Sequence, residues 1–389
     1  MKFLHISDLH IGKRVHEFSM MKDQKYILGK ILEIAGSEQV DGILLAGDIY
    51  DKPVPSAEAV QLFDWFLTSL AERKIKVFAV SGNHDSAERL AFGSQIMSGR
   101  DVYISPVYDG DIAKIELEDG YGKLCVYLLP FVKPAVINHA LELKTFGQEE
   151  MNQNEKDGPF ESYQDALTAA IGRIALDDGV RNILVAHQFV TGAGRCDSES
   201  VAVGGLDNVD AEVFDGFDYV ALGHIHSPQW MKRETVRYSG TPLKYSFSES
   251  AQQKSAVIIE CKEKGDIRLC TVDLTPMHDM KKIRGSYQEV MARSFYQELD
   301  TEDYFQITLT DEEDIPDAMA RLRVIYPNLM QLLYDNSRTK QNHTMMAAQA
   351  METKSELELF EEFYELQNNQ PMGKEQVEFV TKLLEDVQV

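Results

Sequence analysis

The stretch 42–51, GILLAGDIYD, joins a short apolar run to a loop that carries the carboxylates of Asp48 and Asp51. The run is rich in leucine and isoleucine and bounded by glycine and aspartate, which is typical of a strand buried on both faces of a sheet. An aspartate directly after a strand has an ordinary explanation, because Asp, Asn and Gly form the turns that end strands. Taken alone, the stretch predicts a buried strand and a turn.

The same arrangement occurs four more times along the chain. Apolar runs at 2–7, 76–83, 182–188 and 218–224 each end in side chains that can bind a metal ion. The carboxyl ends of strands form the ligand crevice of an open α/β sheet, so we expect these side chains to converge in space. A turn explains any one of them but not the whole series. The series consists of Asp8, His10, Asp48, Asn83, His187, His224 and His226, with His84 and Asp85 following Asn83.

Segments with helical spacing of apolar residues lie between these strands, at 22–38, 56–73 and 162–177. Strands that alternate with helices predict an α/β layered domain. Residues 235–275 alternate in polarity and are expected to form antiparallel strands that close the domain. The first domain is therefore predicted to span 1–275.

Two smaller parts are expected after this domain. Residues 276–337 predict a small α+β cap with a strand at 304–310 and a helix near 315–326. Residues 346–389 predict a helical hairpin, two amphipathic helices separated by a proline and a glycine. The apolar stripes of these helices leave two possibilities open, packing on the cap or binding a partner.

The types of side chain in the series indicate which metal ions they would bind. Imidazole, carboxylate and amide oxygen without thiolate suit manganese or iron, and zinc less specifically. Seven ligands exceed one tetrahedral site, whereas two ions that share a carboxylate would use them all. Two such ions are the usual clamp for in-line attack on phosphorus. The series therefore predicts a phosphoester hydrolase with two divalent ions.

The composition sets limits on other functions. A formal charge of -24, from 63 acidic and 39 basic residues, argues against a protein that wraps nucleic acid on its own. The four cysteines form no C-x-x-C pair, so no structural zinc site is expected. We find no phosphate-binding G-x-x-x-x-G-K-[ST] loop and no apolar run long enough to span a membrane. We expect a cytoplasmic protein that does not itself use ATP.

The ordered motifs DLH, GDIYD, GNHD, AHQ and GHIH resemble those of the calcineurin-like metallophosphoesterases. Within that superfamily, FLHISDLHIGK, LLAGDIYDKPVPS, VSGNHDSAERLAFG and RYSGTPLKYSFSE are similar to the SbcD family of nuclease subunits. The likeness covers 1–275 and is weaker over the cap and tail. It implies an α/β fold, with an α+β four-layer β-sandwich core, followed by a capping domain for DNA recognition.

The resemblance also implies a role for each residue of the series. Asp8, His10 and His226 would hold one metal ion, Asn83, His187 and His224 the other, and Asp48 would bridge them. His84 would act on the phosphodiester in the transition state, and Asp85 would orient it. The expected ions are two Mn²⁺, with Mg²⁺ as the alternative. For Asp51 we expect a supporting or turn role.

The function implied by the family is hydrolysis of DNA in recombination and repair, which would associate this cytoplasmic protein with the nucleoid. The expected activities are ATP-independent 3′-to-5′ exonuclease on double strands and endonuclease on single strands and hairpins. The partner would be an SbcC-like SMC-type ATPase bound through 346–389, with the chain a homodimer inside a heterotetramer. A further possibility is a scaffold whose metal centre has lost its activity, although the complete ligand series argues against it.

A second enzymatic interpretation remains, a phosphatase or small-molecule phosphodiesterase of the same superfamily. Lys52 and Pro53 stand where protein phosphatases of the superfamily carry arginine and glycine, which weakens the monoesterase alternative. If DNA is the substrate, nearby cations are candidates for phosphate contacts, each with a solvated surface role as the ordinary alternative. These cations are Lys13, Arg14, Lys52, Arg89, Lys232 and Arg233.

Overall fold

The computed structural model describes residues 1–146, 159–199, 208–313 and 315–337, with scattered single positions between 360 and 380. The chain divides into two compact units, Met1–Lys281 and Lys282–Val389. The predicted hairpin at 346–389 lies almost wholly outside the described residues. In the described parts, no helix combines the length and apolar character needed to cross a bilayer.

Two six-stranded sheets form the centre of the first unit. The first sheet has the order β16 (Ile267–Asp273), β15 (Ser255–Cys261), β1 (Lys2–Ile6), β4 (Gly42–Ala46), β5 (Lys76–Val80) and β6 (Val102–Ile104). The second has the order β13 (Gln229–Met231), β14 (Arg233–Tyr238), β12 (Tyr219–Gly223), β9 (Arg181–His187), β8 (Gly122–Leu129) and β7 (Ala113–Asp119). The first unit also contains two small two-stranded sheets. One pairs β2 (Arg14–Val15) with β3 (Phe18–Ser19), and the other pairs β10 (Phe189–Val190) with β11 (Asn208–Val209).

The two sheets face each other across an apolar core. Ile183 and Val185 of β9 point into this core with residues of β1, β4 and β5, whereas Leu184 and Ala186 point into a second core that includes Leu167. Both faces of β9 are thus buried, which explains its continuous apolar sequence, because successive side chains of a strand point to opposite faces.

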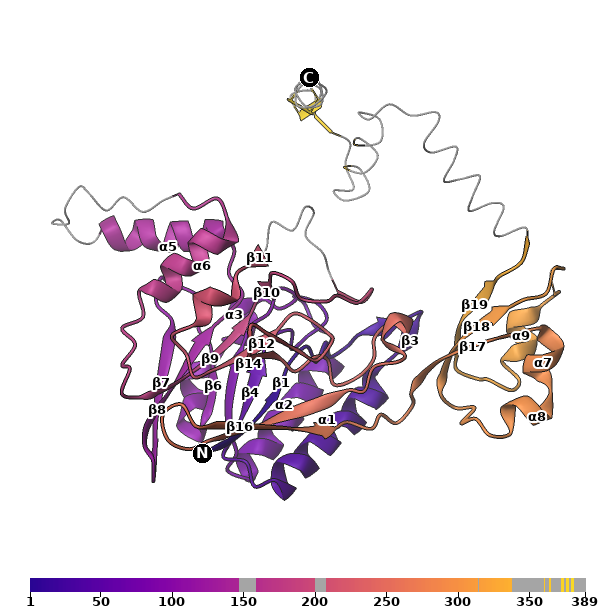
Figure 1. Cartoon of the computed structure of the whole chain (residues 1–389), viewed down its shortest axis with the longest axis horizontal. Coiled ribbons are helices and arrows are strands. Elements are labelled where there is room, and N and C mark those ends of the chain that lie inside the picture. The colour runs from indigo at the N-terminus through magenta and orange to yellow at the C-terminus, as the bar shows by residue number, and fades with distance from the viewer. Residues whose placement is uncertain are drawn as a thin grey trace. The chain divides into compact units, whose positions relative to one another are not determined.

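Helices form the outer layers (Figure 1). The helices α1 (Met21–Ser37) and α2 (Ala57–Glu72) pack side by side, and α2 contacts β5 of the first sheet. The helices α5 (Pro134–Phe146) and α6 (Tyr163–Gly172) also pack together, with α6 covering the second sheet. The order helix, sheet, sheet, helix confirms the predicted four-layer fold.

The sequence located the five motif-bearing strands correctly and misassigned some of their neighbours. β14 runs parallel to β12, so 235–275 is not wholly antiparallel; only β15 and β16 form the expected antiparallel pair. The helix predicted at 162–177 ends at Gly172. Because β1, β4 and β5 lie in one sheet and β9 and β12 in the other, the strand ends converge from two sheets and not from one.

Short elements connect the strands near the motif loops. Residues after β5 form α3 (Ala87–Leu90), α4 (Ser94–Met97) and the 3-10 helix η1 (Ser98–Arg100). Two further 3-10 turns are η3 (Ala211–Phe214) and η4 (Phe247–Glu249).

The second unit contains a three-stranded sheet in the order β17 (Met280–Gly285), β18 (Tyr304–Leu309) and β19 (Leu329–Tyr334). Its short helices are α7 (Tyr287–Met291), α8 (Arg293–Tyr296) and α9 (Ala318–Leu322). Phe305, Ile307 and Leu322 belong to its own apolar core. The strand predicted at 304–310 is present, and the helix predicted near 315–326 is shorter.

Candidate metal centre

The loops after β1, β4, β5, β9 and β12 meet where the two sheets come together. The N–H of His224, after β12, donates to Asp8 Oδ1 at 3.0 Å, which joins the second sheet to the first. The N–H of His84, after β5, donates to Asp48 Oδ1 at 2.9 Å. The loops are therefore tied by their functional side chains.

The first cluster comprises Asp8, His10 and His226, all buried. Each offers a ligand atom, and these atoms lie within 4.8 Å of one another. The Nε2 atoms of His10 and His226 are 3.2 Å apart. This spacing brings the three side chains to one point.

The second cluster comprises Asn83, His187 and His224. Asn83 Oδ1 lies 2.9 Å from His187 Nε2 and 3.0 Å from His224 Nδ1. Asp8, Asp48 and His187 also have ligand atoms within 4.8 Å of one another. The second cluster therefore adjoins the first.

Asp48 lies between the two clusters. Its Oδ2 is 3.7 Å from His10 Nε2 in the first cluster and 3.5 Å from His187 Nε2 in the second. Its side chain is buried. Among the described residues, no other carboxylate lies within 4.0 Å of ring nitrogens of both His10 and His187. This position is suited to a ligand that bridges two ions.

The chemistry of the donor atoms fits metal ions. His187 Nδ1 lies 2.8 Å from the carbonyl oxygen of Ala46, which can only accept, so the proton is on Nδ1 and the lone pair of Nε2 faces Asn83. Burial lowers the pKa of both His187 and His224 to about 3, so both are neutral and able to bind a cation. Burial, with the charge of Asp48 nearby, raises the pKa of Asp8 well above its usual value. A cation would offset this cost of burying carboxylates.

Four of the proposed ligands have strained backbones. Asp8, His10, Asp48 and His224 have φ values of 54°, 44°, 48° and 103°, in a region that side chains with a Cβ rarely occupy. Such strain persists only where the surrounding structure enforces it, and it concentrates at functional sites. Gly82 shows how closely the loops approach, since a Cβ there would lie 2.1 Å from Asp48 Oδ1.

His84 and Asp85 lie at the edge of the clusters. Nδ1 of His84 is 3.1 Å from the carbonyl oxygen of Asp51, and a ligand atom of His84 lies within 4.8 Å of those of His10 and Asp48. The carboxylate of Asp85 accepts from the backbone N–H groups of Ile49, Tyr50 and Gly82 at 2.9 to 3.0 Å. Asp85 thus fastens the two loops that carry Asp48 and Asn83; its orientation of His84 remains a prediction.

The sequence did not reveal the residues that support His226. Ser198 Oγ lies 2.6 Å from His226 Nδ1 and donates to Glu249 Oε1 at 2.6 Å. Glu249 is buried and forms an ion pair with Lys254, which also donates to the carbonyl oxygen of His226. The only signal was the stretch SGTPLKYSFSES, which contains Glu249 but does not indicate which residues this carboxylate contacts.

Most of the cationic side chains suggested by the sequence form ion pairs or hydrogen bonds within the protein. Lys13 pairs with Asp51 at 2.8 Å, and Lys232 pairs with Asp215 at 2.9 Å. Arg233 donates to backbone carbonyls, including that of Phe217. Lys52 and Arg89 are exposed, and Arg14 donates to the carbonyl of Glu17.

The chain is similar to known proteins over almost its whole length. The family model described as calcineurin-like phosphoesterase matches residues 1–228. The SbcD subunit of the nuclease SbcCD from Staphylococcus epidermidis is 31% identical over 391 residues, which cover 99% of this chain and 98% of that protein. The chain belongs to the SbcD branch of the calcineurin-like phosphoesterases.

A family model described as the type 5 capsule protein repressor C-terminal domain matches residues 276–368. Among solved structures, a dimetal phosphatase from Danio rerio is 14% identical, covers 71% of this chain and 99% of its own, and has a TM-score of 0.41. The phosphopantetheinyl hydrolase PptH from Mycobacterium tuberculosis is 15% identical, covers 62% of this chain and 90% of its own, and has a TM-score of 0.34.

Membership in the SbcD branch settles the general chemistry of this site. The chain is a metal-dependent phosphodiester hydrolase, and its family uses a dimetal centre. The assignment of single ligands to single ions remains a prediction, which the two clusters and the position of Asp48 support.

Proposed function

We propose that this SbcD-family chain hydrolyses DNA, as a 3′-to-5′ exonuclease on double strands and an endonuclease on single strands and hairpins. The observation that carries the proposal is Asp48 between two histidine-containing clusters, an arrangement suited to the two ions that clamp a phosphodiester. The relative in Staphylococcus epidermidis is part of a nuclease, which favours DNA over a small phosphoester.

Each residue of the site has a proposed role in metal binding or in proton transfer. Asp8, His10 and His226 would hold one ion, Asn83, His187 and His224 the other, and Asp48 both. The bound ions supply positive charge to the phosphoryl oxygens. The Nδ1–H of His84 donates to the carbonyl oxygen of Asp51, which holds the ring in place. As an imidazolium, with both nitrogens protonated, His84 would donate its Nε2 proton to the leaving oxygen and keep the proton on Nδ1.

We propose manganese as the ion. Four of the seven ligands are imidazoles, whereas magnesium prefers oxygen ligands and keeps its water. Magnesium remains the alternative, and activity restored to metal-free protein by each ion distinguishes them.

A substrate panel tests the proposal. The full chain with manganese is incubated with linear duplex DNA, a single-stranded oligonucleotide, a phosphomonoester and a cyclic nucleotide. Cleavage of the two DNA substrates is expected. Turnover of only the monoester or the cyclic nucleotide would establish the alternative, a phosphatase or small-molecule phosphodiesterase.

The proposed partner is an SbcC-like ATPase bound through 346–389. The relative's name places it in an SbcCD assembly, and the net charge of -24 implies that a partner supplies much of the positive DNA-binding surface. Deletion of 346–389 should abolish co-purification with the ATPase and preserve manganese-dependent cleavage by the isolated chain. Retained binding would place the contact elsewhere.

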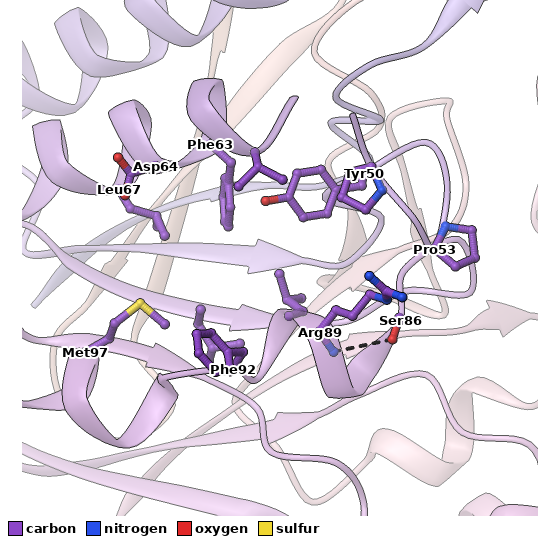
Figure 2. Close-up of a pocket in the computed structure, with 13 residues that line it drawn as sticks. Tyr50, Pro53, Phe63, Asp64, Leu67, Ser86, Arg89, Phe92 and Met97 are labelled. Atoms are coloured by element: carbon purple, nitrogen blue, oxygen red, sulfur yellow. Dashed lines mark hydrogen bonds between the residues drawn. The ribbon is translucent and has the colours of Figure 1, made fainter. Parts of the chain in front are cut away.

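A second copy of the chain is the proposed partner of an apolar surface near the site. A hollow of about 370 Å³ is lined by Phe63 and Leu67 of α2 and by Phe92 and Met97, which follow α3. Figure 2 shows these side chains around it. Phe92 is 86% exposed and Ile96 84% exposed beside it. A surface with both protruding apolar side chains and an apolar hollow suits a two-fold interface, where each copy contributes both.

The double variant Phe92→Asp/Ile96→Asp tests this interface. We expect the wild type to sediment as a dimer and the variant as a monomer, because the variant places charges where apolar surface is buried. The matched control is Val324→Asp, which changes an 83% exposed residue of the second unit. A variant that stays dimeric would move the interface to another surface.

A further inference from the structure

The loop 191–199 places a cation beside the metal centre that the sequence did not suggest, Arg195. Its guanidinium carbon lies 3.8 Å from the centroid of the Phe189 ring. That ring follows His187 by two residues, and its centroid is 6.0 Å from that of His224. The guanidinium therefore lies one aromatic ring away from a residue of the second cluster.

The backbone on both sides of Arg195 is fixed. Before it, Gly194 and Gln229 exchange two hydrogen bonds, from Gly194 N to Gln229 Oε1 at 2.9 Å and from Gln229 Nε2 to Gly194 O at 2.8 Å. After it, Ser198 contacts His226 and Glu249. The backbone near Arg195 is thus held on one side by Gln229 and on the other by Ser198, which also contacts the proposed ligand His226.

Within the described chain, Arg195 forms no ion pair, and its guanidinium stacks on Phe189. Stacking orders a guanidinium through its face and leaves the N–H groups at its edge to bind an anion. A stacked cation at the rim of the site, with no ion pair to the residues that the structure describes, is unusual in a chain with a net charge of -24.

We propose that Arg195 binds the DNA backbone phosphate next to the scissile one. The inference rests on the proposed DNA hydrolysis. The scissile phosphate belongs at the two clusters, and Arg195 lies beyond His224 at their edge, where the strand must continue. Two parallel N–H groups of the guanidinium would donate to the oxygens of that phosphate. Arg195 is thus a substrate-binding residue that fixes the strand and takes no part in the bond cleavage.

Two substrates separate this role from the chemistry. A single-stranded oligonucleotide has neighbouring phosphates, whereas bis(p-nitrophenyl) phosphate has only the scissile one. With full chain and manganese, Arg195→Gln should raise KM for the oligonucleotide about tenfold, change kcat less than about twofold, and lower the salt slope by about 1. Turnover of bis(p-nitrophenyl) phosphate should be unchanged. Arg195→Lys should retain the salt slope and part of the affinity.

A binding measurement and a control complete the experiment. Fluorescence anisotropy of the labelled oligonucleotide, measured in a His84→Gln background to prevent cleavage, should show the same loss of affinity for Arg195→Gln. Arg268→Gln is the matched control, because Arg268 is an exposed arginine on β16. Its oligonucleotide affinity should equal that of the wild type.

The outcomes keep the two proposals apart. Wild-type turnover of bis(p-nitrophenyl) phosphate without DNA cleavage would remove the proposed DNA hydrolysis. Wild-type DNA cleavage with an Arg195→Gln variant of unchanged KM and salt slope would remove only the role of Arg195. Equal losses on both substrates would also contradict it, since they would place Arg195 on the metal centre itself.

Discussion

At the scale of single residues, His84 separates metal binding from catalysis. It belongs to neither ligand cluster, yet its backbone N–H and its imidazole lie against Asp48 and Asp51. We expect His84→Gln to bind two manganese ions with wild-type affinity by calorimetry and to cleave DNA at least about a hundredfold more slowly, the usual contribution of a general acid. Unchanged cleavage would remove His84 from the mechanism, and lost metal binding would make it a ligand.

His5 is a buried histidine with a purely structural role. Its Nδ1 contacts the hydroxyl of Tyr219 at 2.9 Å and its Nε2 the carbonyl of Leu222 at 3.2 Å, which joins β1 to β12. His5 therefore lies between the two sheets and connects them.

The pKa of His5 predicts a pH dependence of stability. Burial lowers this pKa from 6.5 to about 3, so the folded protein resists protonation that the unfolded chain accepts. The stabilisation is complete above about pH 6.5 and is lost as the pH falls toward 3. When the pH is lowered from 7 to 5, the free energy of unfolding of the wild type should fall by about 2 kcal/mol more than that of His5→Gln. Urea titration at both pH values measures the two changes. An equal fall in the free energy of unfolding for the two proteins would contradict the lowered pKa of His5.

At the scale of elements, close approach between the loops after β4 and β5 is what places Asp48. A Cβ on Gly82 would lie 2.1 Å from Asp48 Oδ1 and 2.4 Å from its backbone N. Gly82→Ala should therefore displace Asp48 and lower manganese affinity at least about tenfold, the cost seen when a supporting contact of a metal ligand is lost. Calorimetry of metal-free protein measures the change.

Gly29→Ala is the matched control for Gly82→Ala. Gly29 lies inside α1, where an added Cβ meets nothing within 4 Å. This substitution should raise stability by about 0.5 to 1 kcal/mol and leave metal affinity unchanged. Similar metal affinities for the two variants would contradict a tight fit at Gly82.

The elements that the sequence predicted were those with simple local signals. β4 and β9 are continuous apolar runs because both faces are buried, and that pattern is readable without a structure. β8, of similar character in the run LCVYLL, was overlooked although its signal was present. The pairing of β14 with β12 was not predictable, since a short alternating strand carries no mark of its neighbour's direction.

At the scale of the whole molecule, the pattern of strand ends predicted that the metal-binding residues converge, but only the family resemblance implied that they come from two sheets. The sequence shows that Asp48 and His187 each follow a strand, and the register of those strands is set by long-range packing. Supporting contacts such as Ser198 with His226 also depend on tertiary structure, because they join segments that share no motif. The apolar surface around Phe92 likewise follows from the tertiary structure alone.

The central claim is a two-metal centre in which Asp48 serves both ions. Anomalous diffraction from crystals of the full chain soaked in manganese tests it most directly. We expect two peaks about 3.5 to 4 Å apart, one beside Asp8, His10 and His226 and the other beside Asn83, His187 and His224, with Asp48 between them. A single peak, or two peaks that do not share Asp48, would contradict the account.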